Sequence, residues 1–134
     1  MTRPTSAFQN SETLFRRISK DGVNRNGVAP NAIRFPCCGN RRCYNPDPRA
    51  VCDGLFNGVA ETTPAQVQRV SMDMTVHPET PGCSFSLLDT PTEDNPAHCE
   101  IDVTPLFPQF PTERRTLIKG FLARAYRVLI PPTT

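Results

Sequence analysis

An apolar stripe at helical spacing near the end of the chain predicts an amphipathic helix. Thr112 can cap the start of this helix, and Pro131 marks its end. Phe121 lies in the middle of the stripe, so we expect its side chain to be buried against a sheet. The apolar members of the stripe are Leu117, Ile118, Phe121, Leu122 and Ala125.

Alternation of apolar and polar residues predicts three strands in the middle of the chain, at residues 70–77, 83–87 and 97–103. Loops that contain prolines separate them. Sequential strands joined in this way most simply form an antiparallel meander with one solvated face. We expect Phe121 to pack on the apolar face of this sheet, which carries Val70, Met72, Met74, Cys99 and Ile101.

Capping signals predict two short helices. Thr63, followed by Pro64 and Gln66, combines an N-cap with proline at the first helical position, and this predicts a helix from Pro64 to about Val70. The remaining predicted elements are a short helix that begins at Asp47 and Pro48 and ends at Gly54 or Gly58, and strands at residues 13–18 and 32–35.

Proline makes up 15 of the 134 residues, about 11% and roughly twice the average usage, while hydrophobic residues make up only 37%. A modest core and proline-rich loops follow from this composition. Together with the element pattern, it predicts an α+β fold, in which a C-terminal amphipathic helix and short helices pack on a small antiparallel meander. We expect residues 13–130 to form a single domain. Residues 1–12 are expected to be a disordered or extended tail, and residues 131–134 a second tail.

The chain is weakly basic, with a formal net charge of +2. This charge is too small to predict nucleic-acid binding, and no apolar run is long enough to span a membrane. The predicted C-terminal helix carries Arg114, Arg115 and Arg124 on its polar side. These residues are candidates for contacting a phosphate or an acidic protein partner, although a solvated helix face is the preferred explanation.

The six cysteines admit three interpretations: a metal site, disulfides or buried thiols. The first residues lack the apolar stretch of a secretory signal, so we expect a cytoplasmic protein, or a virion protein if a phage encodes it. Cys38 and Cys43 have the spacing of one arm of a structural zinc site, but no tight second pair follows. We therefore expect no cofactor, with structural zinc as the alternative at Cys37, Cys38, Cys43 and Cys52.

His98 and Glu100 have the spacing of an acid–base pair. They lie two residues apart on a predicted strand, so they project from the face opposite to Cys99 and Ile101. A general acid and base can be arranged in this way. The solvated side of an amphipathic strand has the same pattern, however, and is the preferred interpretation. The common nucleotide-binding and hydrolase motifs are absent, which disfavours an enzyme.

Four short motifs occur in a fixed order along the chain. They are Leu14-Phe15-Arg16-Arg17-Ile18, Ala32-Ile33-Arg34-Phe35-Pro36, Asn40-Arg41 with Tyr44 and Pro48, and Asn95-Pro96-Ala97-His98-Cys99-Glu100-Ile101. In this order they resemble the motifs of a family of small, uncharacterised bacterial proteins. The resemblance implies a bacterial or phage-related origin and singles out Arg34, Asn40, Arg41 and His98, but it implies no reaction. The chain departs from the family pattern at residues 37–39, where Cys-Cys-Gly replaces a Ser-Val-type strand.

Three classes of function are compatible with these observations. The preferred one is a small non-enzymatic interaction module that acts through a protein partner, or as a homo-oligomer, in a bacterial or phage system. The second is an enzyme with a phosphate- or nucleotide-handling site, similar to ADP-ribosyltransferases or nucleases, that uses Arg41, His98 and Glu100. The third is a virion structural protein cross-linked by cysteines. The enzyme alternative requires that Arg41, His98 and Glu100 converge in one cleft.

Overall fold

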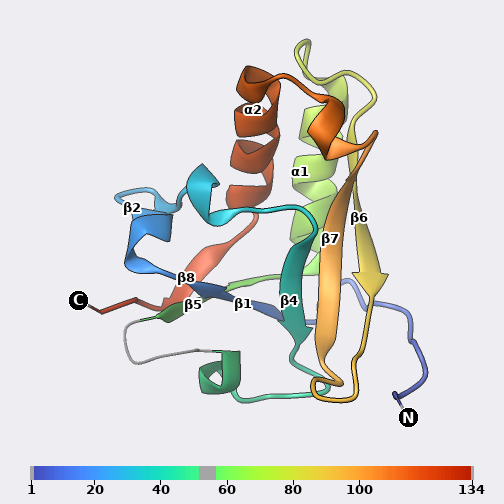
Figure 1. Cartoon of the computed structure of the whole chain (residues 1–134), viewed down its shortest axis with the longest axis vertical. Helices are drawn as coiled ribbons and strands as arrows, with labels where there is room; N and C mark the ends of the chain where they lie inside the picture. The colour runs from blue at the N-terminus through green and yellow to red at the C-terminus, as the bar shows by residue number, and fades with distance from the viewer. Residues whose placement is uncertain (1, 52–56, 134) are drawn as a thin grey trace.

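The described part of the chain contains one six-stranded antiparallel sheet (Figure 1). The structure is a computed structural model that describes residues 2–51 and 57–133. The strands of this sheet are β1 (Leu14–Ile18), β4 (Cys37–Arg41), β5 (Gly58–Thr62), β6 (Ser84–Asp89), β7 (His98–Thr104) and β8 (Arg127–Ile130). Their order across the sheet is β6-β7-β4-β1-β5-β8.

Helices α1 (Pro64–Val76) and α2 (Thr112–Ala123) contact each other and lie side by side (Figure 1). Their buried side chains share a core with the sheet face that carries Ile18, Cys37, Ala60 and Ile101. The α+β class predicted from the sequence is confirmed. The remaining elements are a ribbon of β2 (Val23–Asn24) and β3 (Gly27–Val28), and the 3-10 helices η1 (Lys20–Gly22), η2 (Pro30–Ala32), η3 (Pro48–Val51) and η4 (Phe107–Gln109).

The start of α1 follows the predicted capping signal. The Thr63 side chain accepts a hydrogen bond from the Gln66 amide at 3.2 Å, and Pro64 occupies the first helical position. The helix continues six residues past Val70, the predicted end, to Val76. Pro78 then follows, and His77 has the extended backbone that the residue before a proline prefers.

The predicted strand at residues 70–77 is therefore wrong, because these residues form the second half of α1 and its C-cap. Val70 and Met74, four residues apart, are buried on one helix face, whereas Met72 is 70% exposed. The four apolar residues at positions 70, 72, 74 and 76 have the alternation of a strand, but Val70 and Met74 also have the i, i+4 spacing of a helix face. The sequence pattern therefore does not distinguish the two structures. The cap at Thr63 starts a helix that no breaker interrupts before Pro78.

The other two predicted meander strands correspond to β6 and β7, which pair directly. The second neighbour of β7 is β4, which the sequence pattern did not predict. The strand predicted at residues 32–35 is absent from the described structure, because η2 covers the first of these residues and the others have no regular secondary structure. Ile33 is nevertheless fully buried, so its side chain packs in the core although residue 33 is not part of a strand.

The predicted C-terminal helix ends at Ala123, well before Pro131, and a last strand follows it. In this strand, β8, Val128 and Ile130 are half-buried, whereas Arg127 and Leu129 are exposed. The strand lies at the edge of the sheet against β5. A Cβ atom at Gly58 would collide with the carbonyl oxygen of Ile130, so glycine permits this close approach.

Phe121 is 3% exposed, which confirms its predicted burial. It packs with Met74, Ile118 and Val103, and the His77 ring meets its ring edge-on at 5.5 Å. Met72, which was expected beneath it, points to solvent instead. None of the helices in the described ranges is long and apolar enough to cross a membrane.

We expect Phe121→Ala to lower the free energy of unfolding by about 3–5 kcal/mol, the usual cost of truncating a buried phenylalanine. Urea denaturation of both proteins measures this loss. Met72→Ala is the matched control, because an exposed substitution changes stability by about 0.5 kcal/mol or less. Equal losses in the two variants would contradict the core assignment.

Candidate functional site

Strands β4 and β7 place four polar or thiol side chains on the sheet face away from the core, which we call the open face. Cys38 lies directly opposite Glu100, and Asn40 lies directly opposite His98. Because side chains alternate along a strand, the neighbouring Cys99 points to the other face and is buried. The predicted common face of His98 and Glu100 is present, and β4 adds Cys38 and Asn40 to it.

Cys38, His98 and Glu100 form a cluster, which we call the Cys-His-Glu cluster. The Cys38 sulfur, an imidazole nitrogen and a carboxylate oxygen lie within 4.8 Å of one another. Within residues 2–51 and 57–133, this is the one group of three side chains whose potential metal-ligating atoms meet in this way. Cys38 is exposed, and the other two residues are half-buried.

The His98 ring is oriented by the loop between β6 and β7. Its Nδ1 atom lies 2.9 Å from the Thr90 carbonyl oxygen and 2.9 Å from the Thr90 hydroxyl. Since a carbonyl oxygen can only accept, the first contact requires a hydrogen on Nδ1. In the neutral ring, Nε2 then carries the lone pair and can accept a proton or bind a metal ion.

The open face contains a cavity of about 240 Å³, which we call the open-face cavity. A second cavity of about 400 Å³ adjoins it, and Arg16 and Arg17 line both. Arg34 lines the second cavity. Asn40 and Asn95, whose side chains are joined by a 2.7 Å hydrogen bond, add amide groups to the first one, together with Cys38 and His98.

Arg16 reaches across the sheet where the pairing of β1 with β4 stops. Its two terminal nitrogens donate to the carbonyl oxygens of Cys38 and Ala32, at 2.8 and 2.7 Å. Its Nε atom is buried and has no hydrogen-bond partner. No carboxylate in the described ranges forms an ion pair with this guanidinium. Among the residues that the structure describes, Arg16 is therefore a half-buried cation without a carboxylate counterion.

The electrostatics of Cys38 do not suit a nucleophilic cysteine. Partial burial and the nearby Glu100 carboxylate raise the pKa of its thiol, and these effects exceed the opposite effect of Arg16. A cysteine nucleophile needs a pKa lowered by a nearby cation or helix N-terminus. The cluster is better suited to holding a cation than to generating a free thiolate.

Arg41 does not join His98 and Glu100. Its side chain is 2% exposed and donates hydrogen bonds to Glu12 at 2.8 and 3.0 Å, with Asp89 at 3.2 Å as a second ion-pair partner. Its guanidinium also lies 4.1 Å from the centre of the Phe8 ring. The carboxylates of Glu12 and Asp89 compensate the positive charge of Arg41, and its side chain does not line the open-face cavity.

The Arg41 network fixes the first residues of the chain, which have no regular secondary structure. Arg41 donates to the carbonyl oxygens of Ser6 and Ala7, both at 2.9 Å. Arg3 forms a bidentate ion pair with Asp89 through two 2.7 Å hydrogen bonds. The segment expected to be a disordered or extended tail is thus held against β6 and β4.

The three candidate arginines of α2 do not form one surface. Arg115 and Arg124 are nine residues apart, or about two and a half helical turns, so they lie on opposite sides of the helix axis. Arg115 is half-buried and donates to the Thr112 hydroxyl at 3.0 Å. Arg124 is exposed beside the Phe121 ring, and Arg114 is exposed near the helix start.

The four cysteine candidates for a zinc site are distributed over separate places. Cys37 is buried in the core, with its sulfur 3.7 Å from the Tyr126 hydroxyl. Cys43 is exposed and donates to Glu12 at 3.5 Å, and Cys52 lies outside the described residues. Of the candidates, Cys38 alone belongs to a group of three potential metal-ligating side chains in the described ranges, because β4 pairs it with β7.

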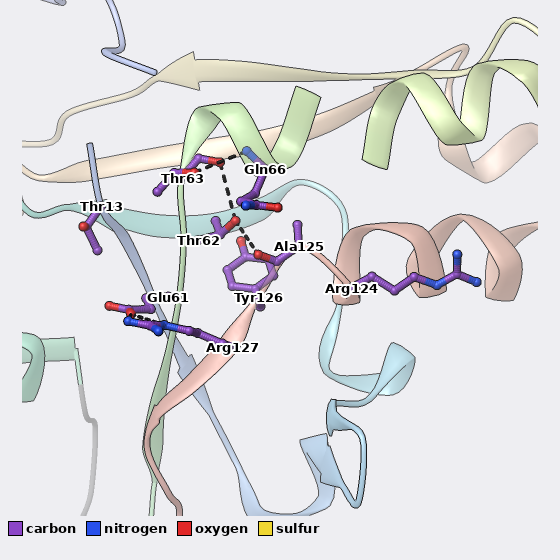
Figure 2. A pocket seen from close by; sticks show the side chains of 9 residues that line it. All are labelled: Thr13, Glu61, Thr62, Thr63, Gln66, Arg124, Ala125, Tyr126 and Arg127. Atoms are coloured by element: carbon purple, nitrogen blue, oxygen red, sulfur yellow. Dashed lines mark hydrogen bonds and ion pairs between the residues drawn. The ribbon is translucent and has the colours of Figure 1, made fainter. Parts of the chain in front are cut away.

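A further cavity, of about 430 Å³, lies between α1, α2 and β5 (Figure 2). Several of its polar groups are already paired with one another. Arg127 forms an ion pair with Glu61, the Thr62 hydroxyl donates to the Ala125 carbonyl at 2.7 Å, and Thr63 caps α1. Figure 2 shows Arg124 pointing away from these groups. We therefore place the candidate site on the open face.

Comparisons with protein-family models, with curated proteins and with solved structures find no match to this chain. The resemblance to a family of small bacterial proteins accordingly stays a prediction.

The ion pairs of Asp89 make acid stability sensitive to this residue. The bidentate Arg3, a hydrogen bond from the Ser6 amide and Arg41 lower the pKa of Asp89 from 3.8 to about 2, despite the opposing effect of burial. Because the folded-state pKa is depressed, the stabilisation is complete above about pH 4 and is lost as the pH falls toward 2. Its size is about 2 kcal/mol.

We expect Asp89→Asn to lower the free energy of unfolding at pH 7 by at least about 2 kcal/mol, and to reduce its dependence on pH between 4 and 2. Denaturant unfolding at a series of pH values measures both effects. Asp94→Asn, at an exposed carboxylate, should keep the wild-type dependence. If the Asp89 variant kept it as well, the buried ion pair would not be what stabilises the N-terminal segment.

Proposed function

We propose that the protein binds a small phosphate-bearing ligand in the open-face cavity, with Arg16 as its anchor. The observation that carries this proposal is that no carboxylate of residues 2–51 and 57–133 forms an ion pair with the guanidinium of Arg16. Arg3, Arg41 and Arg127 each form an ion pair with a carboxylate. Arg16, which is also partly withdrawn from water, donates only to carbonyl oxygens.

A half-buried charge without a counterion is costly, and a bound anion removes that cost. The planar guanidinium matches the oxygens of a phosphate group and binds them through two parallel hydrogen bonds. The buried Nε atom of Arg16 also has no acceptor, which adds to the cost of leaving this guanidinium without an anion. This geometry favours phosphate over an apolar ligand.

The surroundings supply further donors for an anion. Arg17 and the amides of Asn40 and Asn95 line the same cavity as Arg16. The adjoining cavity adds Arg34 and has room for a larger group attached to the phosphate. The proposal therefore includes nucleotides as well as inorganic phosphate.

Of the three functions considered from the sequence, this proposal is nearest to the enzyme alternative, with Arg16 in place of Arg41. His98 lines the cavity and can take part in proton transfer to a bound ligand. The interaction-module and virion functions stay predictions. The support that the basic C-terminal helix gave to the interaction module is weakened, because Arg115 and Arg124 lie on opposite sides of the helix axis.

We expect calorimetric titration with inorganic phosphate, AMP and ATP, in the presence of EDTA, to detect binding that Arg16→Gln weakens by about 10- to 100-fold. This factor corresponds to the loss of a charge-assisted hydrogen bond. Arg25→Gln is the matched control, because Arg25 is exposed in the turn between β2 and β3, far along the chain from the cavity residues of β4 and β7.

Thermal unfolding of each variant should accompany these titrations, because a ligand that binds the folded state raises its melting temperature. The proposal is wrong if none of the three ligands binds the wild-type protein. It is also wrong if Arg16→Gln, with its fold intact, binds as tightly as Arg25→Gln. Tighter binding of ATP than of phosphate would assign the adjoining cavity to the rest of the nucleotide.

A further inference from the structure

Register, rather than spacing in the sequence, brings the Cys-His-Glu cluster together. Cys38 and Glu100 are direct cross-strand partners, and His98 is the diagonal neighbour of Cys38. Strand β7 is hydrogen-bonded on both sides, to β4 and to β6. The backbone positions of the cluster are therefore fixed, and only its side chains need to rotate in order to share a ligand.

The His98 ring has the arrangement typical of a metal-bound histidine. Metal-ligating histidines usually donate their second ring N–H to a carbonyl or carboxylate, which fixes the tautomer and the ring orientation. The Nδ1 atom of His98 donates to the Thr90 carbonyl at 2.9 Å. This contact leaves the Nε2 lone pair available for a cation.

The chemistry of the three side chains selects the kind of cation. A thiolate and an imidazole favour Zn²⁺ and similar transition metals, whereas Mg²⁺ and Ca²⁺ prefer oxygen ligands throughout. An ionised thiolate and carboxylate together carry two negative charges, which a divalent ion neutralises. The same Glu100 carboxylate that opposes a free thiolate therefore favours a metal-bound one.

The distances are compatible with such an ion. In a tetrahedral site, bond lengths of about 2.0–2.3 Å place the ligand atoms about 3.5 Å from one another. The Cys38 sulfur, one nitrogen of the His98 ring and a Glu100 carboxylate oxygen already lie within 4.8 Å of one another. Contraction by about 1 Å lies within the reach of half-buried and exposed side chains.

We propose that Cys38, His98 and Glu100 bind one divalent transition-metal ion of the Zn²⁺ type. Three protein ligands leave one tetrahedral position open, as in catalytic rather than structural zinc sites. Cys38 and His98 line the open-face cavity with Arg16, so a phosphate oxygen is the ligand that completes the coordination. Only this last step rests on the proposed function.

Co²⁺ titration of the full chain, stripped of metal under reducing conditions and in phosphate-free buffer, tests the site. We expect one Co²⁺ per chain, with the near-ultraviolet charge-transfer band of a thiolate ligand and visible bands typical of tetrahedral cobalt. An equivalent of Zn²⁺ should abolish both. Cys38→Ser should lose the charge-transfer band, whereas Cys43→Ser, which removes another exposed thiol, should keep it.

The two histidines of the chain provide a second matched pair. We expect His98→Ala to weaken Co²⁺ binding by at least about 10-fold, and His77→Ala to leave it unchanged. Glu100→Gln should also weaken binding, because the amide removes one ligand charge. Circular dichroism of each variant verifies that the fold is retained, and these comparisons use only variants that pass.

The proposal is overturned if the wild-type protein shows no thiolate–cobalt band, or if Cys38→Ser keeps it while Cys43→Ser loses it. It is also overturned if the two histidine variants bind Co²⁺ equally. Phosphate binding in EDTA depends on Arg16, so its failure alone would refute the proposed function and leave the metal site standing. Loss of the metal site alone would leave the Arg16 site standing.

Discussion

The pairing of β4 with both of its neighbours holds the sheet together, because β6 and β7 reach the other strands only through β4. Gly39 lies where the neighbouring strands come close to β4. A Cβ atom there would lie 3.1 Å from the Phe15 carbonyl oxygen and 3.4 Å from the Cys99 sulfur. Atoms of β1 and β7 therefore pack closely against β4 at Gly39, which has no side chain. The open-face cavity, the Cys-His-Glu cluster and the core beneath Cys37 all depend on this strand.

Two arginines near β4 show how differently the same side chain can be used. Arg41 is surrounded by Glu12, Asp89 and main-chain carbonyls, and its charge is fully compensated. Arg16 spans the opening where β1 leaves β4, and its hydrogen-bond partners in the described part of the chain are main-chain carbonyls. A compensated and buried arginine stabilises the fold, whereas an uncompensated one at a cavity is available to a ligand. The contrast could not be seen in the sequence, where each is the first arginine of an Arg-Arg pair in a short motif.

Sequence reasoning succeeded where a signal was local. The cap at Thr63, the alternation that became β7 and the apolar stripe with Phe121 each depend on residues within one element. It failed for residues 70–77, because a period of two and a period of 3.6 overlap over so short a run. It also missed β8, since its four residues were read as the end of a helix that stops at Ala123.

The candidate site, like the fold, could be predicted from the sequence only where the signal was local. The common face of His98 and Glu100 followed from strand geometry alone, but the position of Cys38 requires the register between β4 and β7. No alternation of apolar and polar residues predicts strand β4, because its residues are two cysteines, a glycine, an asparagine and an arginine. The pairing of two strands that are distant in the sequence places Cys38 beside His98 and Glu100, and neither composition nor periodicity reveals this pairing.

The adjacent Cys37 and Cys38 show what that pairing decides. As neighbours on a strand they point to opposite faces. Cys37 is buried beside Tyr126, and burial raises the pKa of its thiol. Burial likewise raises the pKa of Cys99, on the same side of the sheet, to about 12, so both act as small apolar core residues. Cys38 faces a carboxylate, an imidazole and a cavity. One residue of register therefore separates a core thiol from the proposed metal ligand. Cysteine spacing alone does not reveal this register, so it pointed to Cys38 and Cys43 rather than to Cys38 with His98.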